Sequence, residues 1–138
     1  MKSFCLSLLA VCLAMITCAQ PNTVNYIFST TITGSLVDMS SGTTQLIGAD
    51  QDDIASAVTS LPFEFYFQEV RYTQFTVNSN GSIRLGATAI STTAYDPLAQ
   101  SGQALLSPYG ADQRTHAGNG KIHFRQMGSA PNRILVIE

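Results

Sequence analysis

Apolar and polar side chains alternate with a period of two residues between positions 62 and 85, and this feature most constrains the fold. The segment PFEFYF places three phenylalanines on one face and Glu64 and Tyr66 on the other. Successive side chains of a strand point to opposite faces of a sheet, so the pattern is typical of half-buried strands. From Asn25 onward we find no convincing helical period. The sequence therefore predicts an all-β fold.

The segment FTVNSNGSIRLG predicts a hairpin whose register depends on the length of its turn. A two-residue turn would place the apolar Val77 opposite the polar Arg84. A three-residue loop places Val77 opposite Ile83, and facing residues of a hairpin must share one face. We therefore predict a structural turn formed by Ser79, Asn80 and Gly81.

Two further expectations concern this turn. Gly81 should take the left-handed conformation that closes such a loop, because glycine does so without steric cost. Asn80, Gly81 and Ser82 also fit the acceptor pattern for N-glycosylation, but the turn already accounts for both Asn and Gly. An Asn80→Asp substitution should leave stability near wild type, since aspartate also suits a turn.

The remaining segments favour an antiparallel β-sandwich. We expect strands at residues 25–33, 121–127 and 133–138, and a turn at GSAPN joins the last two. Residues 87–120 should be mostly loop around the short apolar piece ALL, and residues 52–60 should form one or two helical turns. Ile134 to Ile137 are apolar on both faces, which is typical of a central strand flanked by neighbours.

The N-terminus predicts export. Lys2 precedes the apolar run at residues 4–16, which is too short to cross a bilayer but suits a secretory signal peptide. Small residues at Thr17 to Ala19 predict cleavage after Ala19, which leaves residues 20–138 as the mature chain. The alternative is a lipoprotein signal that anchors the chain through Cys18, although Thr17 is bulkier than the residue that usually precedes such a cysteine.

Composition excludes several functions. All 3 cysteines lie within residues 1–19, so the mature chain has no disulfide and no thiolate chemistry. A net charge of -2 and charged residues at only 12% argue against nucleic acid and against an anionic membrane surface. A length of 138 residues leaves room for a single domain.

Five segments carry a family resemblance: YIFSTTITGSLVDM, GADQDDIAS, LPFEFYF, YTQFTVNSNGSIRLG and KIHFRQMGSAPNRILVIE. Together they resemble an N-terminal β-sandwich module of secreted surface proteins in Bacteroidota-type bacteria, over about residues 26–138. The resemblance implies a cargo of type IX secretion with an adhesive or structural role, and it implies no catalytic residues. The family pattern shows a Trp-Asp-Asp-like stretch where this chain has residues 108–112, and it continues past Glu138. We therefore expect an incomplete sandwich that is truncated at its C-terminal end.

Acidic residues near the middle of the chain are weak calcium candidates. Asp50, Asp52 and Asp53 carry the carboxylate oxygens that this cation prefers. An EF-hand loop would need an oxygen ligand at position 54 and glycine at position 55, where the chain has Ile54 and Ala55. A solvated loop that binds no metal is the preferred interpretation, and we expect no cofactor.

The two histidines predict no zinc site, because no cysteine accompanies them in the mature chain. We expect His116 on a loop and His123 on the polar face of a strand, both in solvent. Lys121, His123 and Arg125 alternate along that strand and should present one basic face, either to solvent or to an acidic partner or glycan.

These observations favour a non-enzymatic extracellular or cell-surface module for adhesion or display, whose partner is a surface glycan or protein. A G-x-S-x-G elbow is absent from the sequence, which argues against a serine hydrolase of that type. The alternative is a carbohydrate-binding accessory module of a larger secreted enzyme. Sugars stack on exposed aromatic rings, and the candidates for such contacts are Tyr95 and Tyr109.

Overall fold

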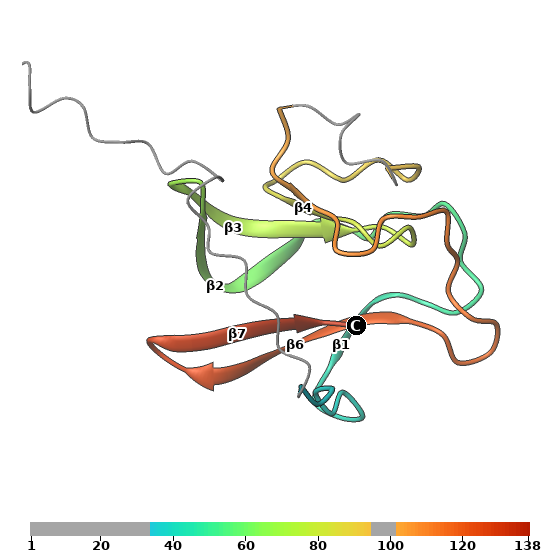
Figure 1. Cartoon of the computed structure of the whole chain (residues 1–138), viewed down its shortest axis with the longest axis horizontal. Coiled ribbons are helices and arrows are strands. Elements are labelled where there is room, and N and C mark those ends of the chain that lie inside the picture. Colours follow the sequence, from blue (N-terminus) through green and yellow to red (C-terminus); the bar gives the residue numbers. More distant parts are fainter. Residues whose placement is uncertain (1–33, 95–101) are drawn as a thin grey trace, which may run out of the picture. The chain divides into compact units, whose positions relative to one another are not determined.

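The computed structural model describes residues 34–94 and 102–138, which form two antiparallel sheets and no helix (Figure 1). The strands are β1 (Thr44–Ile47), β2 (Thr59–Phe67), β3 (Val70–Val77), β4 (Ile83–Leu85), β5 (Leu105–Leu106), β6 (Ile122–Ser129) and β7 (Asn132–Ile137). This confirms the predicted all-β, sandwich-like fold. Within the described ranges, no helix has the length and apolar character needed to cross a membrane.

The two sheets form two layers, with the order β1-β6-β7 in one and β2-β3-β4-β5 in the other (Figure 1). Their inner faces meet in a core of Ile47, Phe75, Val77 and Leu85. Phe75 packs edge-on against Phe124 of the opposite sheet, with ring centroids 5.5 Å apart and planes at 88°. Full burial of such a side chain contributes about 1.5–3 kcal/mol, so this small core provides much of the stability.

The hairpin of β3 and β4 has the register that the sequence predicts. Val77 pairs with Ile83 and Phe75 pairs with Leu85. The loop is closed by a hydrogen bond of 3.1 Å from the Asn78 N–H to the Ser82 carbonyl. Gly81 has a φ of 76°, which confirms the expected left-handed conformation.

The strand expected at PFEFYF is also present and begins earlier, at Thr59. Its register against β3 shifts between Ser60 and Phe65, which marks an irregularity in the pairing. Tyr66 is 62% exposed and lies on the outer side, as its position in the pattern predicts.

One strand was not predicted, and one local expectation is wrong. The sequence of residues 44–47, which form β1, predicted no strand, because a strand as short as this lacks a clear alternation. Residues 52–60 form no helical turn. Their backbone instead makes isolated β-bridges from Asp52 to Arg114 and from Ala55 to Asn78, so contacts with distant segments override the local helical preference.

Strand β7 lies at the edge of its sheet, where it pairs with β6 alone among the described residues. The second neighbouring strand expected for Ile134 to Ile137 is not among the described residues, and Ile134 is 59% exposed. The turn before β7, at Ala130 and Pro131, is as predicted. The signal peptide, the cysteines and the strand expected at residues 25–33 lie outside the described residues.

Candidate functional site

The hairpin loop between β3 and β4 is polar and yet buried. Asn78 and Ser82 are each 1% exposed, and Asn80 is fully buried at 0%. Hairpin loops usually lie in solvent, where water satisfies their polar groups. Buried amides lack this water and need hydrogen-bond partners within the protein. Their partners come from three other segments, which we call the loop cluster: residues 48–56, 89–94 and 109–116.

Asn80 is the centre of the loop cluster. Its Nδ2 atom donates to Asp53 Oδ1 and to the Thr92 carbonyl, each at 2.9 Å. Its Oδ1 atom accepts from the backbone N–H of Gln113 at 2.8 Å. Both amide hydrogens are therefore used inside the protein, which leaves Asn80 no donor for a ligand or for attachment of a glycan.

The neighbouring side chains of the loop act in the same way. Asn78 Nδ2 donates to the carbonyls of Ser91 and Ala94, each at 3.1 Å, and its Oδ1 atom accepts from the Ser82 N–H at 3.0 Å. Ser79 and Ile54 exchange two hydrogen bonds, because the Ser79 N–H donates to the Ile54 carbonyl and the Ile54 N–H donates to Ser79 Oγ. The loop thus holds backbone groups of the adjacent segments in place.

Gly81 is needed for space as well as for its φ. A Cβ atom at this position would clash with the Tyr109 carbonyl oxygen, far inside van der Waals contact. The predicted turn at Ser79, Asn80 and Gly81 therefore packs against residues 109–113. The expectation that Asn80→Asp costs little is not supported by this geometry, since the new carboxylate would face Asp53 and a carbonyl in a buried site.

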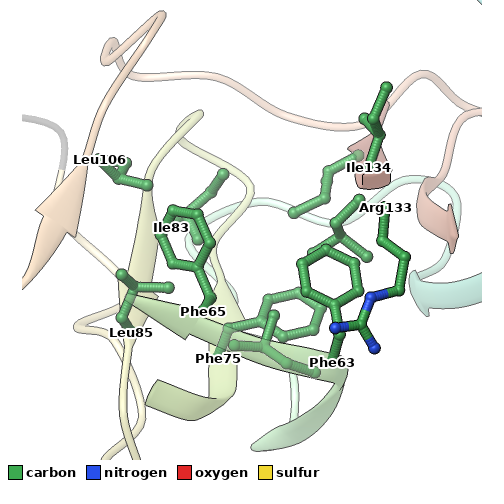
Figure 2. A pocket seen from close by; sticks show the side chains of 11 residues that line it. Phe63, Phe65, Phe75, Ile83, Leu85, Leu106, Arg133 and Ile134 are labelled. Carbon is green, nitrogen blue, oxygen red and sulfur yellow. The ribbon is translucent and has the colours of Figure 1, made fainter. Parts of the chain in front are cut away.

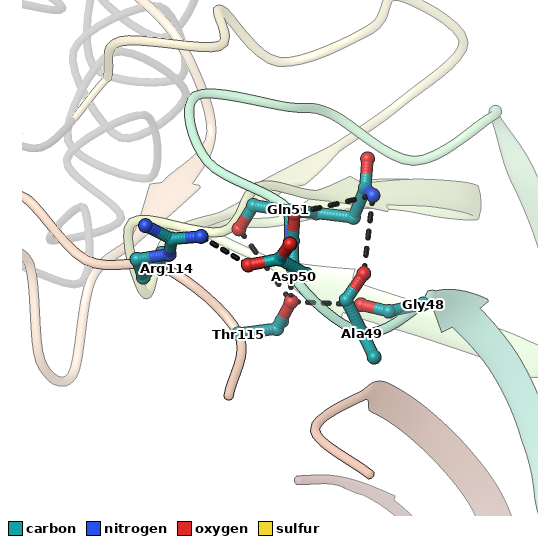
Figure 3. A network of polar contacts seen from close by, with 6 residues as sticks. All are labelled: Gly48, Ala49, Asp50, Gln51, Arg114 and Thr115. Carbon is teal, nitrogen blue, oxygen red and sulfur yellow. Dashed lines mark hydrogen bonds and ion pairs between the residues drawn. The ribbon is translucent and has the colours of Figure 1, made fainter. Parts of the chain in front are cut away.

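The first calcium candidate, Asp50, lies beside the hydrogen bonds that the buried Thr115 makes (Figure 3). Asp50 Oδ1 accepts a hydrogen bond from the Arg114 guanidinium, and both side chains are exposed. Thr115 Oγ1 donates to the Gly48 carbonyl at 2.8 Å and accepts from the Gln51 N–H at 2.9 Å. Asp50 thus forms an ion pair with Arg114 and does not belong to the group that the other two candidates form.

Asp52 and Asp53 instead gather with Asp112, and one carboxylate oxygen of each lies within 4.8 Å of the others. All three residues are exposed. Sequence reasoning did not group Asp112 with this cluster, because it lies about sixty positions away and no local spacing connects it to the others. Oxygen ligands suit Ca²⁺, but that cation takes six to eight of them, and Asp53 already accepts a hydrogen bond from Asn80.

The two histidines occupy different environments. His116 is exposed, as expected, and its Nδ1 atom lies 3.1 Å from Asn119 Oδ1. His123 is only 4% exposed, so its expected position in solvent is wrong. Its Nδ1 atom lies 2.9 Å from Thr43 Oγ1, because the chain that enters β1 covers this face of β6.

The predicted basic face is therefore partly covered. Arg125 donates to the Ser41 carbonyl at 3.1 Å, beside the buried His123. Lys121 remains exposed. A strand pattern shows which side chains share a face, but it does not show which segment covers that face.

Two exposed tyrosines lie at separate places among the described residues. Tyr109 is 73% exposed, on the loop that packs against Gly81, and Tyr95 lies outside the described residues. Tyr66 is 62% exposed and pairs across the sheet with Arg71, which forms an ion pair with Glu64. The hydrogen bond from Arg71 holds the pKa of the Glu64 carboxyl below its ordinary value.

An apolar groove of about 320 Å³ lies apart from the loop cluster (Figure 2). The inner face of β2 to β5 forms one side, and residues of β7 form the other. Among the described residues that line it, only Arg133 is charged, and its guanidinium carbon lies 5.1 Å from the ring centroid of Phe63. Sequence reasoning missed this groove, because it expected a strand on each side of β7.

Comparison with known proteins gives one match. Residues 25–138 match a family model whose description is "NIDO related". Searches of the curated proteins and of the solved structures found no match. The matched range includes all of the described strands and the segment at residues 25–33.

Proposed function

Because the chain belongs to the NIDO-related family, and NIDO is an extracellular domain, we propose that it is a non-enzymatic module for adhesion or display outside the cell. The supporting observation is how the polar side chains of the loop cluster are used. The side chains of Asn78 and Asn80 form hydrogen bonds with the backbone of neighbouring loops. These bonds connect the loops to one another, and Tyr109 of the same cluster is exposed at the surface, where a partner could contact it.

Adhesion can be measured with the mature chain coupled to beads and applied to surfaces that carry glycans or extracellular proteins. Retention of the beads above the level of uncoated beads is the expected result. A Gly81→Val variant serves as the misfolded control, since the clash at Tyr109 should disrupt the loop cluster. Equal retention of wild-type, variant and uncoated beads would contradict the proposal.

A carbohydrate-binding accessory module is the second candidate, and the exposure of Tyr109 and Tyr66 favours it. Aromatic faces of this kind can stack on sugar rings. On a glycan array, Tyr109→Ala or Tyr66→Ala should then abolish a signal that the wild type gives, with an unchanged melting temperature. The absence of any glycan signal for the wild type would exclude this candidate for the glycans displayed.

We also propose that export uses a signal peptide cleaved after Ala19, with lipidation of Cys18 as the alternative. Origin in a Bacteroidota-type bacterium and secretion by the type IX route remain predictions from the resemblance. Mass spectrometry of exported protein should find an N-terminus at Gln20. A diacylated Cys18 would instead show an anchored protein.

A further inference from the structure

Asparagine is followed directly by glycine at two places in the chain, Asn80 before Gly81 and Asn119 before Gly120. Glycine has no Cβ atom, so its backbone nitrogen can approach the side-chain carbonyl carbon of the preceding asparagine. An asparagine before glycine is therefore especially prone to spontaneous loss of its side-chain amide. The structure places the two pairs in opposite environments, because Asn80 is buried and Asn119 is exposed.

This reaction, deamidation, needs only water and a base that accepts one proton. The glycine nitrogen gives up its proton and bonds to the asparagine Cγ atom, which closes a succinimide ring. The bond from Cγ to Nδ2 breaks, and Nδ2 leaves as ammonia after it takes a proton from solvent. Water then opens the ring to aspartate or isoaspartate. The glycine nitrogen must therefore be free to move, the leaving group must be free to depart, and water must reach both.

The loop cluster opposes all of these steps at Asn80. The side chain is fully buried, and its Nδ2 atom, the leaving group, donates to Asp53 Oδ1 and to the Thr92 carbonyl. Its Oδ1 atom is held by the Gln113 N–H. Asn80 can therefore react only when the loop cluster opens. The carboxylate that results has no N–H to donate, so it cannot restore the bonds to Asp53 and Thr92.

Asn119 lies in an exposed turn at residues 117–119. Its Oδ1 atom lies 3.1 Å from His116 Nδ1, and its Nδ2 atom makes no hydrogen bond with a described residue. One bond holds the attacking nitrogen, because the Gly120 N–H donates to the His116 carbonyl at 3.0 Å. Exposed turns open locally at a small cost in free energy, so this bond delays the reaction far less than the loop cluster does. A Cβ atom at Gly120 would clash with the backbone of His116, so the turn itself requires this glycine.

We propose that Asn119 is a site of spontaneous deamidation in the folded protein, whereas the loop cluster protects Asn80 until it opens. The product at position 119 adds a negative charge to an exposed turn and leaves the fold intact. The product at position 80 prevents the loop cluster from closing in its native form. The inference goes beyond the proposed function, because it concerns a covalent change of the chain and not the binding of a partner.

The test follows both sites in the mature chain during incubation at neutral pH, in buffer and in denaturing urea. Trypsin separates the sites, because residues 72–84 carry Asn80 and residues 115–121 carry Asn119, and mass spectrometry detects the conversion of an amide to an acid. In buffer, Asn119 should convert at least tenfold faster than Asn80. In urea both pairs are exposed, so the two rates should agree within about threefold. Asn119→Gln is the matched control, since the longer side chain closes a ring less readily and residues 115–121 should then keep their mass.

Asp53→Ala tests whether the loop cluster is what protects Asn80. Loss of the acceptor for Asn80 Nδ2 should raise the rate at Asn80 in buffer at least fivefold and leave the rate at Asn119 unchanged. The exposed Asp52→Ala should change neither rate. Three results would each overturn the proposal. They are an Asn119 that stays intact in buffer while it converts in urea, equal rates at the two sites in buffer, and an Asp53→Ala variant that converts Asn80 no faster than the wild type.

Discussion

Asn80 Nδ2 lies 2.9 Å from Asp53 Oδ1, and this hydrogen bond connects the buried tip of the β3–β4 hairpin to a loop that precedes β2. Asp53 has a φ of 46°, a left-handed conformation that aspartate tolerates better than most residues. The conformation of one loop is therefore fixed by an amide of another. Hydrogen bonds to a charged acceptor contribute about 1.5–3 kcal/mol each, so the contact is large enough to measure.

Gly81 should be intolerant of any side chain. Gly81→Ala should lower the free energy of unfolding by about 2–5 kcal/mol, because a left-handed conformation and a backbone clash both oppose the new Cβ atom. Gly42→Ala is the matched control, since Gly42 has a φ of 67° and a Cβ atom added there would meet no other atom within 4 Å. Urea unfolding of both variants measures the difference. Equal losses would show that Tyr109 does not constrain the turn.

His123 should matter for stability and His116 should not. His123→Ala removes a buried ring and leaves Thr43 Oγ1 without its partner, so we expect a loss of about 2–3 kcal/mol. His116→Ala affects an exposed side chain and should change stability by about 0.5 kcal/mol or less. Thermal melts distinguish the two. A His123→Ala variant as stable as His116→Ala would place His123 in solvent after all.

Calcium should have little effect on stability. Asp52, Asp53 and Asp112 are exposed and each bring one carboxylate oxygen to their cluster, whereas Ca²⁺ takes six to eight oxygen ligands. A ligand that binds only the native state must raise the melting temperature. Millimolar CaCl₂ should therefore shift it by less than about 2 °C. A larger rise that is lost in Asp112→Asn, and kept in Asp50→Asn, would establish a metal site.

Much of the fold could be predicted from the sequence, because strand alternation is a local signal. The pairing of Val77 with Ile83 followed from that alternation and from one glycine. The burial of Asn80 could not be predicted in this way, since its partners at positions 53, 92 and 113 are distant in sequence. Local reasoning identified a turn, but only the tertiary structure shows that this turn organises three other segments.

The same limit applies to the three-stranded sheet and to the acidic cluster. Ile134 to Ile137 are apolar on both faces, which indicates contact on both faces but does not specify which neighbours lie beside the strand. His123 alternates with charged residues, yet the chain that enters β1 covers it. The grouping of Asp112 with Asp52 and Asp53 had no local signal either.

The central claim is that the hairpin loop is a buried structural hub, and a double-mutant cycle on Asn80 and Asp53 tests it most directly. Asn80→Asp should lower the free energy of unfolding by about 2–4 kcal/mol, because a carboxylate at the buried position 80 would lose its two hydrogen-bond donors and face the carboxylate of Asp53. Asp52→Asn is the exposed control. Combining Asn80→Asp with Asp53→Asn restores a donor and an acceptor, so we predict a favourable coupling energy of about 1–3 kcal/mol. Additive effects, or an Asn80→Asp variant that keeps wild-type stability but loses binding in the bead assay, would contradict the claim.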